Sequence, residues 1–331
     1  LRLIIRWILA WTVPRSFFAH PQRFRSDASG RMREYMYVRT GGRGNRSHVV
    51  LMAFGPEGTD FRPVAAVGRV GYLPQRLQDA IAAAGDANVY DADGYIWNDA
   101  AGDAADGIVQ VAELALLPSK EDRGRRGRTQ RLPPFSTSNG WGGRMGSDLS
   151  FYTDGRQTAD GKVTGFRPVA FRDSGAPVYG LEGMVKLDSD ETGDLVPLPE
   201  HDLLLVQSRK GYPRSSWIKG LDSDTGALRW RYPNPAPGVH GALRSKLSPS
   251  PGLVFGSVKI TGTADVGGEL GTVFHIRGYM GEDYLLTADG LFVGAIFPDT
   301  RLPSAGALPP SEEAIRGKSV AHITQGQEPF N

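Results

Sequence analysis

The chain contains no cysteine among its 331 residues. This absence excludes disulfide bridges, thiolate zinc sites and cysteine nucleophiles together. An excess of charge is missing as well, because 38 basic residues face 36 acidic ones and leave a formal net charge of +2. Domains dedicated to nucleic acid usually carry a clear basic excess, so we expect no nucleic-acid partner.

Long hydrophobic runs are also missing. The most apolar stretch is residues 1–13, which Arg2 and Arg6 interrupt. It is too short to cross a bilayer, so we expect no transmembrane segment. No small-residue cleavage site follows it, which favours a β-strand over a signal peptide. The chain begins with Leu1 in place of Met, and we interpret it as a fragment of a larger polypeptide.

Helix-forming sequence is scarce. Only residues 76–84 show helical spacing, with Leu77 and Ile81 on one face and Gly85 as the stop. The charge run 120–131 is interpreted as a solvated loop, with contact to an anionic polymer as the alternative. Elsewhere, apolar runs of strand length alternate with Gly and Asp turns. This pattern predicts an all-β domain.

Residues 217–232 predict a β-hairpin. Apolar side chains alternate on both sides of a turn that runs from Asp222 to Gly226. Aspartate favours such a turn because it bonds to its own downstream backbone, and glycine accepts positive φ without steric cost. Four further strands are expected in sequence, at residues 253–260, 272–277, 283–287 and 291–297. Four antiparallel strands joined by tight turns are typical of one propeller blade.

The hairpin resembles the repeat of PQQ-like β-propellers, in which an Asp-x-x-Thr-Gly-x-x-x-Trp motif closes each blade. The residues that carry this resemblance are Asp222, Asp224, Thr225, Gly226 and Trp230. It implies one propeller domain over residues 1–331, with about six to eight four-stranded antiparallel blades. A fragment would leave that propeller incomplete at its ends. The best-defined blades are expected over 200–300, with one short helix and an inserted acidic loop elsewhere.

That acidic loop, residues 91–113, resembles the calcium loops of EF-hand and dockerin-like segments. From Asp106 the match includes a following Gly, a carbonyl donor at Ile108 and a Glu in the bidentate position. The front half departs from the pattern, since Gly102 and Ala104 stand where ligands belong. An insertion would reconcile the two halves and implies a calcium site formed by Asp99, Asp103, Asp106, Ile108 and Glu113. An acidic loop without metal remains the alternative.

The sequence offers few signs of catalysis. It has no Gly-x-Ser-x-Gly elbow and no His-Glu-x-x-His pair, and His240 and His275 are interpreted as structural. PQQ itself is not expected, because quinoproteins often use an adjacent-cysteine disulfide and only one Trp hairpin is clear here. Trp230 is interpreted as docking one blade against the next.

These observations predict a non-catalytic binding or scaffold module of an exported bacterial protein, extracellular or periplasmic. Its ligand, protein or carbohydrate, would bind on the propeller face, because loops carry function while the blades hold them. Two enzymatic alternatives stay open: a PQQ-dependent quinoprotein oxidoreductase, and a carbohydrate-active enzyme with its site at the central channel. A purely structural part of a large surface protein is a third.

Overall fold

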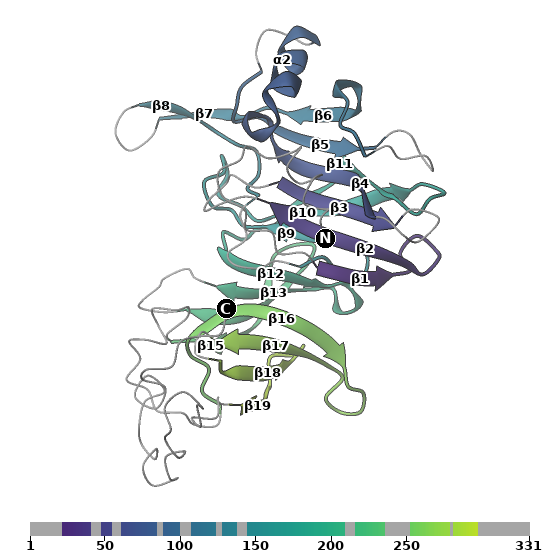
Figure 1. The fold of residues 1–331 in the computed structure, drawn as a ribbon. Coiled ribbons are helices and arrows are strands. Elements are labelled where there is room, and N and C mark those ends of the chain that lie inside the picture. The colour runs from purple at the N-terminus through teal and green to yellow at the C-terminus, as the bar shows by residue number, and fades with distance from the viewer. Residues whose placement is uncertain are drawn as a thin grey trace, which may run out of the picture. The chain divides into compact units, whose positions relative to one another are not determined.

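A computed structural model describes residues 22–40, 48–54, 61–84, 89–99, 107–123, 128–137, 144–208, 216–235, 252–278 and 281–296 (Figure 1). The strand expected within residues 1–13 lies outside these ranges. The chain forms two compact units. Unit 1 comprises Leu1–Asn139, Gly143–Asp190 and Val196–Pro199, and unit 2 comprises Gly140–Gly142, Glu191–Leu195 and Glu200–Asn331.

Unit 1 is built on a six-stranded antiparallel sheet whose strands lie side by side in chain order (Figure 1). Its strands are β1 (Gln22–Ser26), β2 (Arg33–Thr40), β3 (His48–Phe54), β4 (Phe61–Arg69), β5 (Gly94–Asn98) and β6 (Leu114–Leu117). A second sheet has the order β11-β10-β9, with β9 at Phe151–Thr153, β10 at Thr164–Phe171 and β11 at Pro177–Lys186. The short 3-10 turns are η1 (Val70–Tyr72) and η3 (Val111–Glu113).

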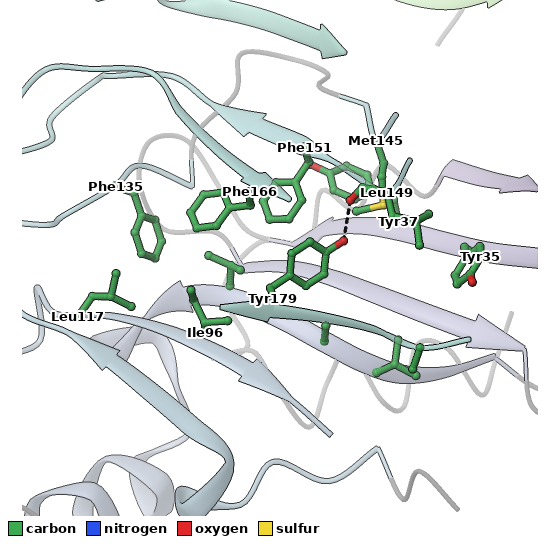
Figure 2. Packing of buried hydrophobic residues seen from close by; sticks show 14 residues of the cluster. Tyr35, Tyr37, Ile96, Leu117, Phe135, Met145, Leu149, Phe151, Phe166 and Tyr179 are labelled. Carbon is green, nitrogen blue, oxygen red and sulfur yellow. Dashed lines mark hydrogen bonds between the residues drawn. The ribbon is translucent and has the colours of Figure 1, made fainter. Parts of the chain in front are cut away.

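The core of unit 1 joins side chains of these two sheets. Alternation along β2 sends Tyr35 and Tyr37 to the face that packs with Phe151, Phe166 and Tyr179 of the second sheet. Figure 2 shows the rings of Phe151, Phe166 and Tyr179 close together, and the rings of Phe151 and Phe166 are stacked with their centroids 4.8 Å apart. The Tyr179 hydroxyl is buried and donates to the Leu149 carbonyl oxygen at 2.7 Å.

The other face of the six-stranded sheet packs against helix α2 (Gln75–Ala84). Ile81 of the helix is buried among Met36, Val38 and Trp97 of the sheet. This confirms the helix predicted at 76–84 and the inward face on which Ile81 was placed. None of the helices in the described part of the chain has the length and apolar character that crossing a membrane requires.

The charge run 120–131 is a hairpin and not the expected loop. β7 (Lys120–Arg123) pairs with β8 (Thr129–Leu132), and Lys120 lies opposite Leu132. The pairing is anchored at its base by Arg131. Its guanidinium lies 3.5 Å above the ring of Tyr90 and donates to the Ser119 hydroxyl at 3.0 Å. The pattern of charges in 120–131 could not predict this hairpin, because Tyr90 and Ser119, which hold Arg131, lie outside that run.

Two four-stranded antiparallel sheets, each in chain order, make up the described part of unit 2, except that residues 196–199 of the first sheet are counted with unit 1. The first has β12 (Gly193–Leu198), β13 (Leu203–Ser208), β14 (Trp217–Asp222) and β15 (Leu228–Pro233), with η4 (Pro199–His201) between the first two strands. The second has β16 (Ser257–Asp265), β17 (Thr272–Gly278), β18 (Asp283–Thr287) and β19 (Phe292–Ile296).

The strand predictions for unit 2 are largely confirmed. The hairpin over 217–232 is present, and the four later strands pair with one another, although β16 begins at Ser257 and extends to Asp265. The all-β class with one α-helix therefore holds for the described residues. No closed barrel or propeller is formed within them, so the blades stay a prediction.

Candidate functional site

The two sheets of unit 2 have two different ends. At one end, which we call the turn end, short turns at 199–202, 223–227, 266–271 and 288–291 join the strands. At the other, the loop end, the strands are joined through 209–216, 234–256 and 279–282, and this set includes the longest connection of the unit. Cross-sheet bonds show that like ends adjoin, with His201 Nε2 lying 2.7 Å from Thr272 Oγ1 at the turn end.

The turn end is held by the motif residues. Asp222 Oδ1 accepts from the backbone N–H groups of Asp224 and Thr225 and from the Thr225 hydroxyl, at 2.8 to 3.1 Å. Gly226 has a φ of 80° and donates its N–H to the Asp222 carbonyl oxygen at 2.9 Å. Four of the five motif residues therefore build a turn, and the fifth, Trp230, reaches the neighbouring sheet, where it stacks on Phe274.

The loop end contains a buried polar group that we call the amide cluster: Gln207, Ser216, Asn234 and Ser257. All four are at most 3% exposed. Gln207 Nε2 donates to the carbonyl oxygen of Ser257 at 2.6 Å and to its hydroxyl at 2.9 Å. Asn234 Nδ2 donates to the same hydroxyl at 2.7 Å, and the Asn234 N–H donates to the Ser216 carbonyl oxygen at 3.2 Å. The cluster thus ties both sheets together.

Three oxygens of the amide cluster have no hydrogen-bond partner within the described ranges: Gln207 Oε1, Asn234 Oδ1 and Ser216 Oγ. A buried polar atom left unpaired costs about 1–3 kcal/mol, so native proteins nearly always supply it with a partner. Two of the three oxygens can only accept. Hydrogen-bond donors such as hydroxyl or ammonium groups would complement them.

One ion pair of this end is buried. Glu191 is buried and accepts from the Ser208 hydroxyl and the Lys219 ammonium group. Two further carboxylates, Asp194 and Glu282, are fully buried, in β12 and just before β18. The loop end is consequently rich in acceptors, and the ammonium group of Lys219 is already engaged.

The expected calcium residues are only partly within the described ranges. Asp103 and Asp106 lie outside them. Asp99 is 2% exposed and accepts from the Gly107 N–H at 2.7 Å, whereas Ile108 is 47% exposed. Glu113 caps η3 and accepts from Trp97 Nε1 at 2.7 Å. Where the structure describes the chain, no group of three acidic, histidine or cysteine side chains is arranged to hold a metal ion.

His275 occupies a hydrogen-bonded chain on the second sheet of unit 2. Its Nε2 lies 2.8 Å from Asp283 Oδ1, and its Nδ1 contacts the Thr261 hydroxyl. Hydroxyl, imidazole and carboxylate in a row are also the parts of a nucleophilic triad. Here they link three neighbouring strands, β16 to β18, and both ring nitrogens are occupied. This arrangement agrees with a structural role for His275.

The amide cluster could not be predicted from the sequence. Its residues are ordinary polar side chains at strand ends, and none belongs to a motif. One signal was present: Gln207 and Ser208 end a strand whose preceding residues, 203–206, are all apolar and buried. A polar pair that continues a fully buried strand must find partners inside the protein. The chain matches no protein-family model and no curated protein.

Proposed function

We propose that this chain is a non-catalytic binding module of an exported bacterial protein, acting outside the cell or in the periplasm, and that it binds carbohydrate at the loop end of unit 2. We propose further that the two four-stranded sheets of this unit are successive blades of a β-propeller. Trp230 would then dock the first blade on the second, as the PQQ-like repeat implies.

The observation that carries the proposal is the set of three unpaired, buried oxygens in the amide cluster. Sugar hydroxyl groups are donors, and amide and serine oxygens are suitable acceptors for them. The compensated pair Glu191–Lys219 favours a neutral ligand over an ionic one.

A glycan array of soluble polysaccharides and oligosaccharides tests the proposal, followed by titration calorimetry with the best ligand. Ser216→Ala is the informative variant, because it removes an unpaired hydroxyl and should leave the unliganded protein as stable as before. Loss of one hydrogen bond worth about 0.5–1.5 kcal/mol predicts roughly threefold to tenfold weaker binding. The control is Ser223→Ala, which alters a buried serine at the turn end and should bind normally.

Other outcomes separate the alternatives. Binding to displayed peptides but to no glycan would replace carbohydrate by protein as the ligand. Release of shortened sugars on the same panel would favour the carbohydrate-active enzyme. Dye reduction with alcohols or sugars after addition of PQQ and calcium would favour the quinoprotein. Silence in all assays would contradict the binding proposal and favour a purely structural part.

We also propose that the acidic segment around 99–113 takes up calcium. Gly107 supports this, since it adopts the positive φ of 67° that the sharp bend of a calcium loop needs. Calorimetry should then detect binding tighter than millimolar, weakened at least tenfold in Glu113→Gln. The matched control is Glu34→Gln, which alters an exposed ion pair on β2. The absence of any such binding would remove the calcium proposal and leave the carbohydrate proposal intact.

A further inference from the structure

Arg39 places a guanidinium group in the interior of unit 1. Alternation along β2 puts it on the same face as Tyr35 and Tyr37, the face that packs against the second sheet. Across the sheet its neighbour in register is Val49, which in turn lies opposite the core residue Val67. The positions in register with Arg39 on β3 and β4 are therefore valines, whereas β2 carries a cation.

The Arg39 side chain is buried and incompletely paired. The residue is 9% exposed, and its Nη2 donates to the Tyr37 hydroxyl at 3.0 Å. Nε and Nη1 have no hydrogen-bond partner among the residues that the structure describes. An arginine carries five N–H donors and is always charged, so burial leaves it in need of acceptors and of negative charge.

The charge of Arg39 acts on one described carboxylate, Asp154, and this carboxylate is already engaged. It is fully buried just after β9, its Oδ2 lies 3.2 Å from Arg156 Nη2, and its Oδ1 accepts from the Arg156 N–H at 3.1 Å. Burial raises the pKa of the Asp154 carboxyl, and the charges of Arg156 and then Arg39 oppose that rise. The Asp154 carboxylate is thus paired with Arg156, and Arg39 forms no ion pair with any residue that the structure describes.

We propose that Arg39 is the anchor of a second ligand site, which takes a small monoanionic carboxylate. The carboxylate would supply the missing negative charge and acceptor atoms for Nε and Nη1. A dianion such as phosphate suits the position less well, because the buried Asp154 carboxylate would repel it. The site lies in unit 1 and stands independently of the proposed carbohydrate site.

The test measures thermal unfolding of the whole chain while acetate replaces chloride at constant ionic strength. We expect a saturable rise in Tm of about 2–4 °C for the wild type once acetate is well above its Kd. Arg39→Met should show no rise. Its Tm without acetate should equal or exceed that of the wild type, because an apolar side chain of similar length replaces an unpaired buried charge.

Two further variants keep the test decisive. Arg39→Lys retains the charge but has fewer hydrogen-bond donors, so half-saturation should need at least tenfold more acetate. This variant also replaces Arg39→Met in the test if the methionine variant does not fold. Arg31→Met, at an exposed position, should behave as the wild type. A flat wild-type response would overturn the proposal, as would an acetate shift that persists in both Arg39 variants. A larger shift with phosphate than with acetate would overturn the carboxylate assignment.

Discussion

Trp230 donates its indole N–H to the carbonyl oxygen of Ala288 at 2.7 Å, and this bond joins the two four-stranded sheets of unit 2. The indole also stacks on Phe274, with ring centroids 6.0 Å apart. One side chain therefore supplies both a polar and an apolar contact to the neighbouring sheet. This geometry is what a residue that docks one blade on another requires, and it underlies the first prediction.

Trp230→Phe should lower the free energy of unfolding by about 1–2 kcal/mol. Phenylalanine keeps the ring contact with Phe274 but leaves the buried Ala288 carbonyl oxygen without its donor. Urea denaturation measures the change. Trp217→Phe is the control, since Trp217 lies beneath Arg231 at 4.6 Å, and no hydrogen bond or ring contact joins it to the described residues of the second sheet. Equal losses in both variants would contradict the role given to the Ala288 bond.

Gly220→Ala should destabilise the protein by about 1–3 kcal/mol through steric overlap. A Cβ at Gly220 would overlap the Trp230 indole, which lies directly against the backbone there. The matched control is Gly294→Ala on β19, where an added Cβ meets no atom within 4 Å. The urea concentration at the midpoint of unfolding should fall for Gly220→Ala and should be unchanged or slightly higher for Gly294→Ala. A neutral Gly220 variant would show that the indole is free to shift.

Asp222 should make stability depend on acid pH. Hydrogen bonds from Arg229, and then from the N–H and hydroxyl of Thr225, hold the pKa of its carboxyl well below the ordinary value. The stabilisation is therefore complete above the unfolded pKa of about 3.9 and is lost as the pH falls toward the folded value. Because the turn is partly exposed, we expect no more than about 1 kcal/mol.

Asp222→Asn tests this dependence. Asparagine keeps an acceptor oxygen for the turn but does not titrate, so the free energy of unfolding should fall less steeply below pH 4 than in the wild type. Above pH 6 the variant should show a constant small deficit. Parallel curves across the whole range would assign the acid sensitivity to other carboxylates.

Lys219→Met should cost about 3 kcal/mol, because it leaves the buried Glu191 carboxylate without its cation. Adding Glu191→Gln in the same chain should restore most of the loss, since no buried charge then remains unpaired. Thermal unfolding of the two single variants and the double variant measures the coupling. Additive losses would mean that the two charges act independently.

Much of the fold could be predicted because its signals are local. The helix at 75–84 follows from spacing and a glycine stop, and the Asp222–Gly226 turn follows from side chains that bond to their own backbone. The hairpin at 120–132 was missed because its strands carry charged residues, and its anchor, Tyr90, lies some distance back in the chain. Whether the four-stranded sheets belong to a closed propeller stays a prediction.

The candidate sites were much less predictable. Gln207 and Ser257 are fifty positions apart in the chain and meet only because two separate sheets pack together. Arg39 and Asp154 likewise come from different sheets, and the sequence around each shows an ordinary polar residue. Convergence of such pairs depends on non-local packing, which no short motif encodes.

The amino-acid sequence alone therefore determined the β class and the positions of the turns, because each depends on residues within a few positions of one another. The tertiary structure alone decided which polar groups became buried without partners. Burial is a property of neighbouring sheets, and a side chain acquires it only when residues distant in sequence close around it.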